Sequence, residues 1–376
     1  MKNKFIVEQK SLLSILSSMQ PICTKRTTLD TTSTILFQVG HKELILKSTD
    51  LEISLQASYL LKESDLTEPR VFLVSGRRLF DLVKELEGDI TFILDDAALI
   101  VKAGSVNVAL NIQDARDFPP FPERIENLMQ LSAPFLLELL NKVAFLISQN
   151  NANPSLNGLL LEINESELKM TASDGHCLAQ VQTSLYCLEE SRKWLLPRRA
   201  VFEVKKILEM SNDSSIFLGL CGNQLVFSGE SFNFFTKLLV DSFPSYGAIL
   251  HKEGFAPARI DRSAFIKTLR RSACLLSGQF IATNFMFSPE KLKVSLHNKE
   301  VGTLEEEVIL YDFTGSQCDI RFYAPYLLSG LQVFPGEQLQ FYLQGKGKPI
   351  IFDAQGSSDT CVYNMFYLVM PVAQTS

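Results

Sequence analysis

The stretch TASDGHCLAQ, residues 171–180, places a carboxylate and an imidazole two positions apart, at Asp174 and His176. Such a pair can act as general base and general acid when a substrate reaches both groups. The same residues also suit a hairpin turn, because Asp and Gly tolerate the positive φ that tight turns require. The stretch therefore allows two hypotheses, an acid–base enzyme or a structural turn between two strands.

The remaining chemistry-bearing residues form no recognisable catalytic or metal-binding pattern. The four histidines show no HExxH spacing, and the seven cysteines are scattered with no CxxC pair. No GxSxG, Walker or GxGxxG motif is present, and GKGKP (345–349) lacks the spacing of a phosphate loop. We therefore predict no catalytic residues, no metal and no cofactor. Scattered, odd-numbered cysteines are typical of reduced thiols, which favours a cytoplasmic protein.

Composition indicates a folded protein of more than one domain. The chain has 376 residues, of which 46% are hydrophobic and 21% charged, and it contains neither a signal-peptide pattern nor a membrane-length apolar run. The net charge of −6 argues against nucleic acid as a partner unless basic side chains gather on one face.

An internal repeat divides the chain into thirds. Phe118-Pro119 and Phe243-Pro244 lie 125 positions apart, and Met370-Pro371 follows after another 127. This spacing predicts three domains at residues 1–125, 126–250 and 251–376. Asp174 has partners in the same register, Asp50 and Asn298, each 124 positions away. A catalytic carboxylate has no reason to recur in this way, so the repeat favours the turn.

Each third has the same pattern of elements. Apolar residues at helical spacing predict two helices per third, at 12–19 and 75–86, 135–147 and 197–208, and 265–276 and 323–334. Short segments alternating with period two predict six to eight antiparallel strands per third, such as 35–39, 44–48 and 90–94. The predicted fold class is α+β, with three tandem similar domains, each of two helices on an antiparallel sheet layer.

Basic residues gather on these predicted helices and in the loop after the first one. Each group alone is typical of a solvated helix face, but together they predict one positive surface in an acidic protein. The residues are Lys25, Arg26, Arg77, Arg78, Arg198, Arg199, Lys205, Lys206, Lys267, Arg270 and Arg271.

The full chain resembles the bacterial β sliding clamps of DNA polymerase III. The resemblance rests on LNG (156–158), SDGHCLA (173–179), LLPRRAV (195–201), FTKLLVDSFPSY (235–246) and LVMPV (368–372), with TDLE and RDFP in order before them. It implies a DNA polymerase processivity factor, a homodimer in which each chain forms half of a closed ring around double-stranded DNA. The basic residues above would then face the DNA. The implied partners are the replicative polymerase catalytic subunit, the clamp loader, and other polymerases and repair proteins that carry short clamp-binding peptides.

Helix size supports the dimer independently. Helices packed at about 8–10 Å spacing give a hole of roughly 15–19 Å for six helices and roughly 30–38 Å for twelve. A duplex needs roughly 20 Å, so two chains fit and one does not. A ring that slides should contact phosphates rather than bases, because phosphate attraction carries no sequence information.

The resemblance also implies a hydrophobic pocket for partner peptides and a dimer interface. The pocket residues carried over by position are Leu156, Ser173, Gly175, His176, Leu178, Pro244, Ile249, Val369, Met370, Pro371 and Val372. The interface would pair an edge strand around Val106 and Val108 with the third domain near Leu275 and Leu276. Cys177, Gly247 and Ala248 stand where the family commonly has basic residues, so we expect a less positive pocket. The alternatives left open are a repeat scaffold that never meets DNA and the acid–base enzyme.

Overall fold

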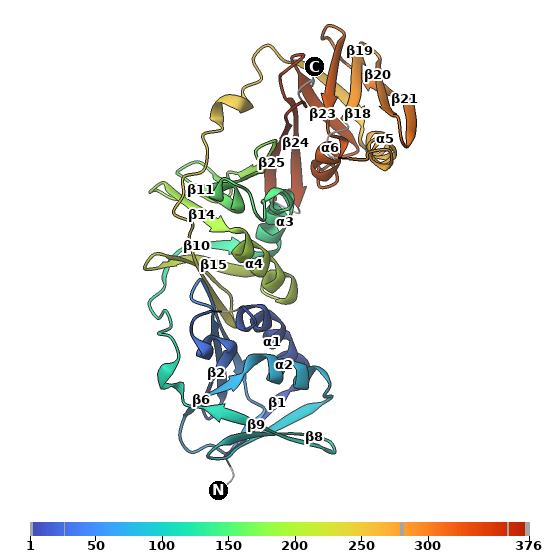
Figure 1. The fold of residues 1–376 in the computed structure, drawn as a ribbon. Coiled ribbons are helices and arrows are strands. Elements are labelled where there is room, and N and C mark those ends of the chain that lie inside the picture. The colour runs from blue at the N-terminus through green and yellow to red at the C-terminus, as the bar shows by residue number, and fades with distance from the viewer. Residues whose placement is uncertain (1–2, 26, 279–281, 359–360, 373–376) are drawn as a thin grey trace. The chain divides into compact units, whose positions relative to one another are not determined.

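The computed structural model describes residues 3–25, 27–278, 282–358 and 361–372, and within them the chain forms two compact units (Figure 1). Unit 1 comprises residues 1–134 and 202–238, and unit 2 comprises residues 135–201 and 239–376. All strand pairs in both units are antiparallel within this described part, as the period-two segments predict.

Six α-helices occur in the described residues, and each overlaps one of the predicted helices. They are α1 (Gln9–Cys23), α2 (Gly76–Lys84), α3 (Ala133–Val143), α4 (Arg198–Met210), α5 (Arg262–Cys274) and α6 (Ala324–Leu331). The predicted α+β class, with two helices in each third, is confirmed.

Unit 1 contains one sheet of 13 strands. In spatial order these are β10 (Glu126–Ser132), β15 (Ser215–Cys221), β16 (Gln224–Ser228), β17 (Phe232–Lys237), β4 (Ile53–Leu60), β3 (Glu43–Thr49), β2 (Thr34–Val39), β6 (Arg70–Ser75), β9 (Val106–Gln113), β8 (Ala98–Ala103), β7 (Asp89–Leu94), β1 (Asn3–Glu8) and β5 (Glu63–Ser64).

Unit 2 contains one sheet of 12 strands. In spatial order these are β14 (Arg192–Pro197), β11 (Gly158–Ile163), β12 (Leu168–Ser173), β13 (Cys177–Thr183), β25 (Cys361–Val369), β24 (Ile350–Ser358), β23 (Gln338–Leu343), β18 (Ala256–Asp261), β21 (Gly302–Tyr311), β20 (Lys291–Asn298), β19 (Thr283–Ser288) and β22 (Cys318–Phe322).

The middle third supplies strands to both sheets. Its strands β10 and β15 to β17 join the sheet of unit 1, with β17 pairing to β4, whereas β11 to β14 join the sheet of unit 2 through β13 and β25. The division between the units falls within α3 and within α4. Main-chain pairing therefore links each neighbouring pair of thirds into a continuous sheet.

The core of each unit lies between the sheet and its helices, as Figure 1 shows for α1 with α2 and for α5 with α6. Phe5, Phe37 and Phe92 are fully buried in unit 1. The ring centroid of Phe92 lies 5.0 Å from that of Phe5 and 6.4 Å from that of Phe37. Phe265, Phe285 and Phe322 form the corresponding aromatic group in unit 2. Burial of such rings is the main driving force for these elements to pack.

Candidate functional site

The turn between β12 and β13 uses the Asp174 carboxylate structurally. Its Oδ1 accepts the backbone N–H groups of His176 at 2.8 Å and of Cys177 at 2.7 Å. Gly175, with φ of 94°, supplies the left-handed conformation that the turn needs. The His176 ring stacks on Tyr326 with a centroid distance of 5.5 Å. The carboxylate is therefore occupied by backbone donors, as expected for a turn rather than a catalytic base.

The same arrangement recurs in the other two thirds. Oδ1 of Asp50 and Oδ1 of Asn298 each accept backbone N–H groups two and three residues onward, at 2.9–3.0 Å and 3.0–3.4 Å. Asn298 also donates through Nδ2 to the Leu275 carbonyl at 2.7 Å and to Ser277 Oγ at 2.8 Å. An amide both accepts and donates, whereas an ionised carboxylate only accepts, which explains the Asn in the third copy.

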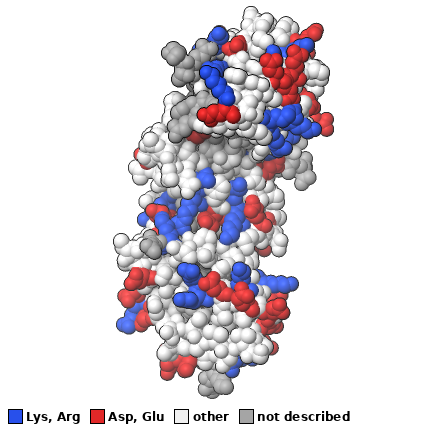
Figure 2. Space-filling model, turned by 45° about the vertical axis from the view of Figure 1, so that its right-hand side comes forward, with Lys and Arg blue, Asp and Glu red and all other residues white. Residues whose placement is uncertain are grey.

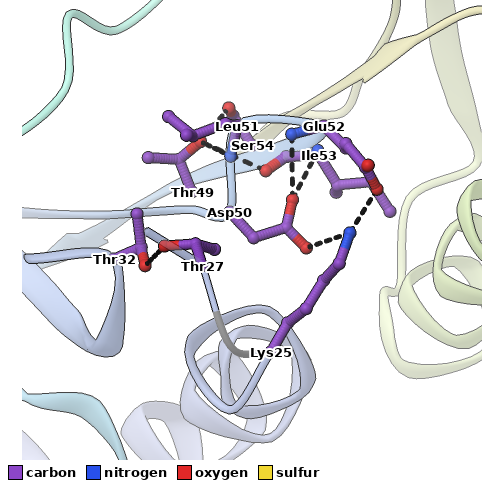
Figure 3. A network of polar contacts seen from close by, with 9 residues as sticks. All are labelled: Lys25, Thr27, Thr32, Thr49, Asp50, Leu51, Glu52, Ile53 and Ser54. Atoms are coloured by element: carbon purple, nitrogen blue, oxygen red, sulfur yellow. Dashed lines mark hydrogen bonds and ion pairs between the residues drawn. The ribbon is translucent and has the colours of Figure 1, made fainter. Parts of the chain in front are cut away.

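The first copy of the turn is drawn in Figure 3. Leu51 adopts φ of 74°, and Thr49 Oγ1 accepts its backbone N–H at 3.1 Å. Lys25 ion-pairs with Glu52, and its Nζ lies 3.8 Å from the buried Asp50 carboxylate. The Lys25 ammonium therefore joins the segment after α1 to the turn.

Tyr246 joins two apolar clusters in unit 2. One cluster contains Leu156 and Phe243 and the other contains Leu178, and the Tyr246 ring packs against both. Its hydroxyl donates to Glu162 Oε2 at 2.6 Å. Burial, followed by the hydrogen bond to Glu162, raises the pKa of Tyr246 to about 12. This ring fixes the segment after β17 against β11 and β13.

The predicted pocket residues of the middle third lie around these clusters and the Asp174 turn. A Cβ on Gly175 would lie 3.7 Å from Leu156 Cδ1, so the turn faces Leu156. Ser173 Oγ donates to the Cys177 carbonyl at 2.7 Å. In the segment after β17, the backbone N–H of Ile249 donates to the Tyr246 carbonyl at 3.1 Å, and Pro244 lies two residues before Tyr246 in the chain.

The C-terminal pocket residues reach the same turn through main-chain pairing. Val369 on β25 lies opposite Cys177 on β13, and Met370 donates its backbone N–H to the His176 carbonyl at 2.9 Å. Two residues later, Val372 donates its backbone N–H to the Arg321 carbonyl at 2.8 Å. Residues 370–372 therefore run from the turn to β22.

A cavity of about 370 Å³ opens along residues 370–372. Three predicted pocket residues, Met370, Pro371 and Val372, contribute to its lining. The other lining residues, which sequence reasoning missed, are Asp319, Ile320, Arg321, Lys346 and Gly347. The cavity thus combines an apolar wall with two cationic side chains and one carboxylate.

Two weak signals pointed to the missed residues. Lys346 and Gly347 belong to GKGKP, a segment that is rich in Gly and Lys but lacks the spacing of a phosphate loop. Arg321 occupies a strand position between the buried residues Ile320 and Phe322, so its side chain emerges on the solvent face. Arg321 and Lys346 thus add positive charge beside Met370, while the less positive pocket expected from Cys177, Gly247 and Ala248 stays a prediction.

The basic helix residues fall into exposed and engaged groups. Arg77, Arg78, Lys267 and Arg270 are exposed on α2 and α5. Arg271 is also exposed, and two of these five residues form ion pairs, Arg271 with Glu306 and Arg77 with Asp81. The five exposed side chains are the ones best placed to meet an external anion.

The basic residues of α4 are half-buried, and several bind the protein itself. Arg198 donates to the Ile147 carbonyl, and Lys206 donates to the Ser17 carbonyl at 2.5 Å. Lys205 lies over the Phe202 ring at 5.3 Å, and desolvation lowers the pKa of its ammonium. Arg199 is half-buried beside them, and Arg26 lies outside the described residues.

On the face drawn in Figure 2, Lys and Arg side chains gather in patches with Asp and Glu side chains beside them. The structure also contains ion pairs between a helix cation and a carboxylate, such as Arg77 Nε with Asp81 Oδ2 at 3.8 Å. The separation of charges expected from the sequence is therefore incomplete.

Besides the terminal strands of the two sheets, β9 and β21 each have a largely unpaired edge within the described residues. β9 pairs with β8 along residues 106–111 but reaches β6 only at Ile112 and Gln113. β21 pairs with β20 along its length but reaches β18 only at Leu310 and Tyr311. Val106 is exposed and Val108 half-buried on the first edge. Leu275 and Leu276, directly after α5, are half-buried.

Neither a cluster of three metal-ligating side chains nor a helix long and apolar enough to span a membrane occurs among the described residues. All seven cysteines are free thiols.

Comparison with known proteins gives matches along the whole chain. Models of the N-terminal, central and C-terminal domains of the DNA polymerase III beta subunit match residues 3–122, 130–245 and 248–372. A beta sliding clamp from Pseudomonas putida is 30% identical, over 98% of this chain and 99% of the relative. One from Staphylococcus aureus is 24% identical over the same shares.

Solved structures give the same result. A sliding clamp from Pseudomonas aeruginosa bound to griselimycin matches with a TM-score of 0.89 and 27% identity, over 99% of this chain and 100% of that one. A clamp from Bacillus subtilis matches with a TM-score of 0.90 over 100% of both chains, and its 20% identity makes that likeness one of fold.

Proposed function

The chain belongs to the DNA polymerase III beta subunit family, the sliding clamps that act as processivity factors in DNA replication, and we propose that two copies close into a ring around double-stranded DNA. The observation that carries the proposal is the match of the three beta-subunit domains, in order, to residues 3–122, 130–245 and 248–372. The proposed domains are 1–125, 126–250 and 251–376.

The proposed ring closes when the free edge of β9 in one copy pairs with the free edge of β21 in the other. The free edge of β9, with Val106 and Val108, would meet β21 of a second copy, with Leu275 and Leu276 covering the joint. Main-chain hydrogen bonds would then satisfy both edges, which are otherwise exposed to unwanted pairing. A head-to-tail contact of this kind closes when two copies complete the circle.

The proposed DNA contacts come from the exposed cations Arg77, Arg78, Lys267 and Arg270. Flexible side chains on a helix surface attract phosphates without reading bases, and each such contact releases counterions. Retention would then depend on encirclement rather than on affinity. Lys25, Arg198 and Lys206, which bind the protein itself, would serve mainly to hold the helices in place.

The proposed partner site is the apolar surface that joins the Asp174 turn to the cavity beside Met370. Short peptides of the polymerase catalytic subunit, the clamp loader and repair proteins would place aliphatic and aromatic anchors there. The chain would have no catalytic role, since Asp174 serves the turn and His176 lies on the rim. The proposed location of the protein is the cytoplasm.

Retention on nicked circular DNA tests the proposal. We expect the protein, loaded by its clamp loader, to stay on the circle through gel filtration and to leave once the DNA is linearised, because only topology holds it. The double variant Arg77→Glu/Arg78→Glu should load less and show a salt slope smaller by about 0.9 for each lost phosphate contact.

The matched control is Lys42→Glu/Arg70→Glu, which reverses two exposed cations of the same unit outside the helices. It should behave like the unmodified protein. Equal loss from circular and linear DNA would contradict encirclement and favour the non-DNA scaffold.

A further inference from the structure

Arg321 lines two cavities of unit 2 at once. One is the cavity of about 370 Å³ beside Met370, and the other, of about 550 Å³, lies over β19, β20 and β21. Arg321 stands on the solvent face of β22, between the buried residues Ile320 and Phe322. Its side chain is therefore the link between the apolar anchor site and a second hollow.

The cations of the first cavity have no carboxylate partner in the described part of the chain. Arg321 and Lys346 make no ion pair there, whereas Lys291 and Lys293 on the same sheet face pair with glutamates at 2.9 Å and 3.1 Å. Asp319, also in the lining, makes no ion pair there either. Two cations and one carboxylate leave an excess positive charge, which suits a single acidic side chain of a ligand.

The second cavity follows a row of aligned strand positions. Arg321 on β22 lies opposite Asn284 on β19, Asn284 opposite Ser295 on β20, and Ser295 opposite Glu305 on β21. Three strand spacings of about 4.8 Å give a path of roughly 14 Å, the length of about four extended residues. Glu305 is already paired with Lys293 at 3.1 Å, so the row beyond Arg321 offers mainly neutral hydrogen-bonding groups.

We propose that the peptide site extends past Met370, with an acidic residue next to the apolar anchor bound by Arg321 and Lys346 and about four further polar residues crossing β22, β19, β20 and β21. The inference rests on the proposed peptide-binding function of the Met370 surface. A nucleic-acid strand is a poorer occupant, because Asp319 and Glu305 would face its phosphates.

Fluorescence anisotropy with labelled peptides tests the extension. The probes are a core peptide of the type Gln-Leu-Ser-Leu-Phe, the core with Asp plus four Ser/Asn residues at either end, and the same extensions with Asn in place of Asp. We expect one acidic extension to bind about fivefold more tightly than its Asn counterpart, the upper range for a solvent-accessible ion pair. Arg321→Ala should abolish that gain, so that the acidic extension and its Asn counterpart bind this variant equally.

Two variants separate the parts of the site. Lys348→Ala, which removes a cation from the same loop as Lys346 but outside both cavities, should keep the gain. Ser295→Tyr should fill the second hollow. The long acidic extension should then lose affinity, whereas a further probe, the core peptide extended by Asp alone, should bind with unchanged affinity. Tyr is well accepted on a strand surface, and circular dichroism would verify folding.

The outcomes distinguish the two proposals. If the core peptide binds but neither acidic extension gains, or if the gain survives Arg321→Ala, the extension is wrong and the anchor site stands. If the core peptide itself fails to bind, both are overturned. Displacement of the extended peptide by a single-stranded oligonucleotide, with no displacement of the core, would assign the second hollow to nucleic acid and overturn the peptide extension.

Discussion

Substitution of Asp174 should separate the structural turn from acid–base chemistry. Asp174 Oδ1 accepts two backbone N–H groups, at 2.8 Å and 2.7 Å, and the side chain is half-buried. Asn preserves this acceptor and Ala removes it. We therefore expect Asp174→Asn to fold almost as stably as the unmodified protein and Asp174→Ala to be clearly destabilised.

The size of the effect follows from the two bonds. Each is worth about 1 kcal/mol net at a solvent-accessible turn, so Asp174→Ala should cost about 2 kcal/mol. For a unit of roughly 200 residues this lowers the unfolding temperature by about 4–8 °C. Asp174→Asn should cost less than about 0.5 kcal/mol, because Asn keeps the Oδ1 acceptor and removes only the negative charge.

The third copy of the turn gives the matched comparison. Asn298 is buried and also donates to the Leu275 carbonyl and to Ser277. Asn298→Asp would lose both donations and place a carboxylate beside a carbonyl oxygen, at a cost of about 2–4 kcal/mol. The reciprocal exchange of Asp and Asn should thus be harmless at 174 and harmful at 298.

Differential scanning calorimetry of the four variants, Asp174→Asn, Asp174→Ala, Asn298→Asp and Asn298→Ala, measures these differences. Equal unfolding temperatures for Asp174→Asn and Asp174→Ala would refute the role of Oδ1 as a backbone acceptor. An Asn298→Asp variant as stable as Asp174→Asn would refute the explanation of the Asn in the third copy.

Two further predictions concern ionisable groups whose pKa is raised by burial, the half-buried Tyr246 and the buried Cys177. The folded-state pKa of Tyr246 is raised to about 12 from its ordinary value of 10.0, so its contribution to stability is present below pH 10 and is lost as pH rises towards 12. The difference in unfolding free energy between the unmodified protein and Tyr246→Phe, measured by urea unfolding, should therefore shrink over this range. A constant difference would contradict this prediction. Burial also raises the pKa of the Cys177 thiol, so iodoacetamide at pH 8 should alkylate the exposed Cys187 and Cys274 well before Cys177, as followed by mass spectrometry. Cys177 labelling at the rate of Cys187 in the folded protein would be inconsistent with its burial.

Local patterns predicted the elements well because their causes are local. Helical spacing of apolar residues located all six helices, and alternation located strands such as β2, β3 and β7. The strand β4 lies between β3 and β17 in the unit 1 sheet, a placement that no local pattern predicts. Its sequence, ISLQASYL, has polar residues at several positions, and its pairing partner β17 comes from the middle third.

Charge patterns predicted surfaces less well than elements. A basic residue on a helix can face solvent, as Arg77 does, or bind a neighbouring carbonyl, as Lys206 does with Ser17. The sequence has the same appearance in both cases, because the acceptor belongs to a distant segment. Arg321 and Lys346 could not be predicted for the same reason, because their cavity forms only where β22, the loop after β23 and residues 370–372 meet.

The sequence by itself determined the threefold repeat, the two helices of each third and the turn at each copy of Asp50, Asp174 and Asn298. The helices and turns depend on backbone preferences and side-chain spacing within about a dozen residues, and the repeat is the recurrence of these local patterns, so the amino-acid order specifies all three directly. Only the tertiary structure decided which cations remain free to meet a partner and that three separate segments enclose a charged cavity beside Met370. Those outcomes depend on distances between residues far apart in the chain, which are fixed only when strands such as β13 and β25 pair and the core closes.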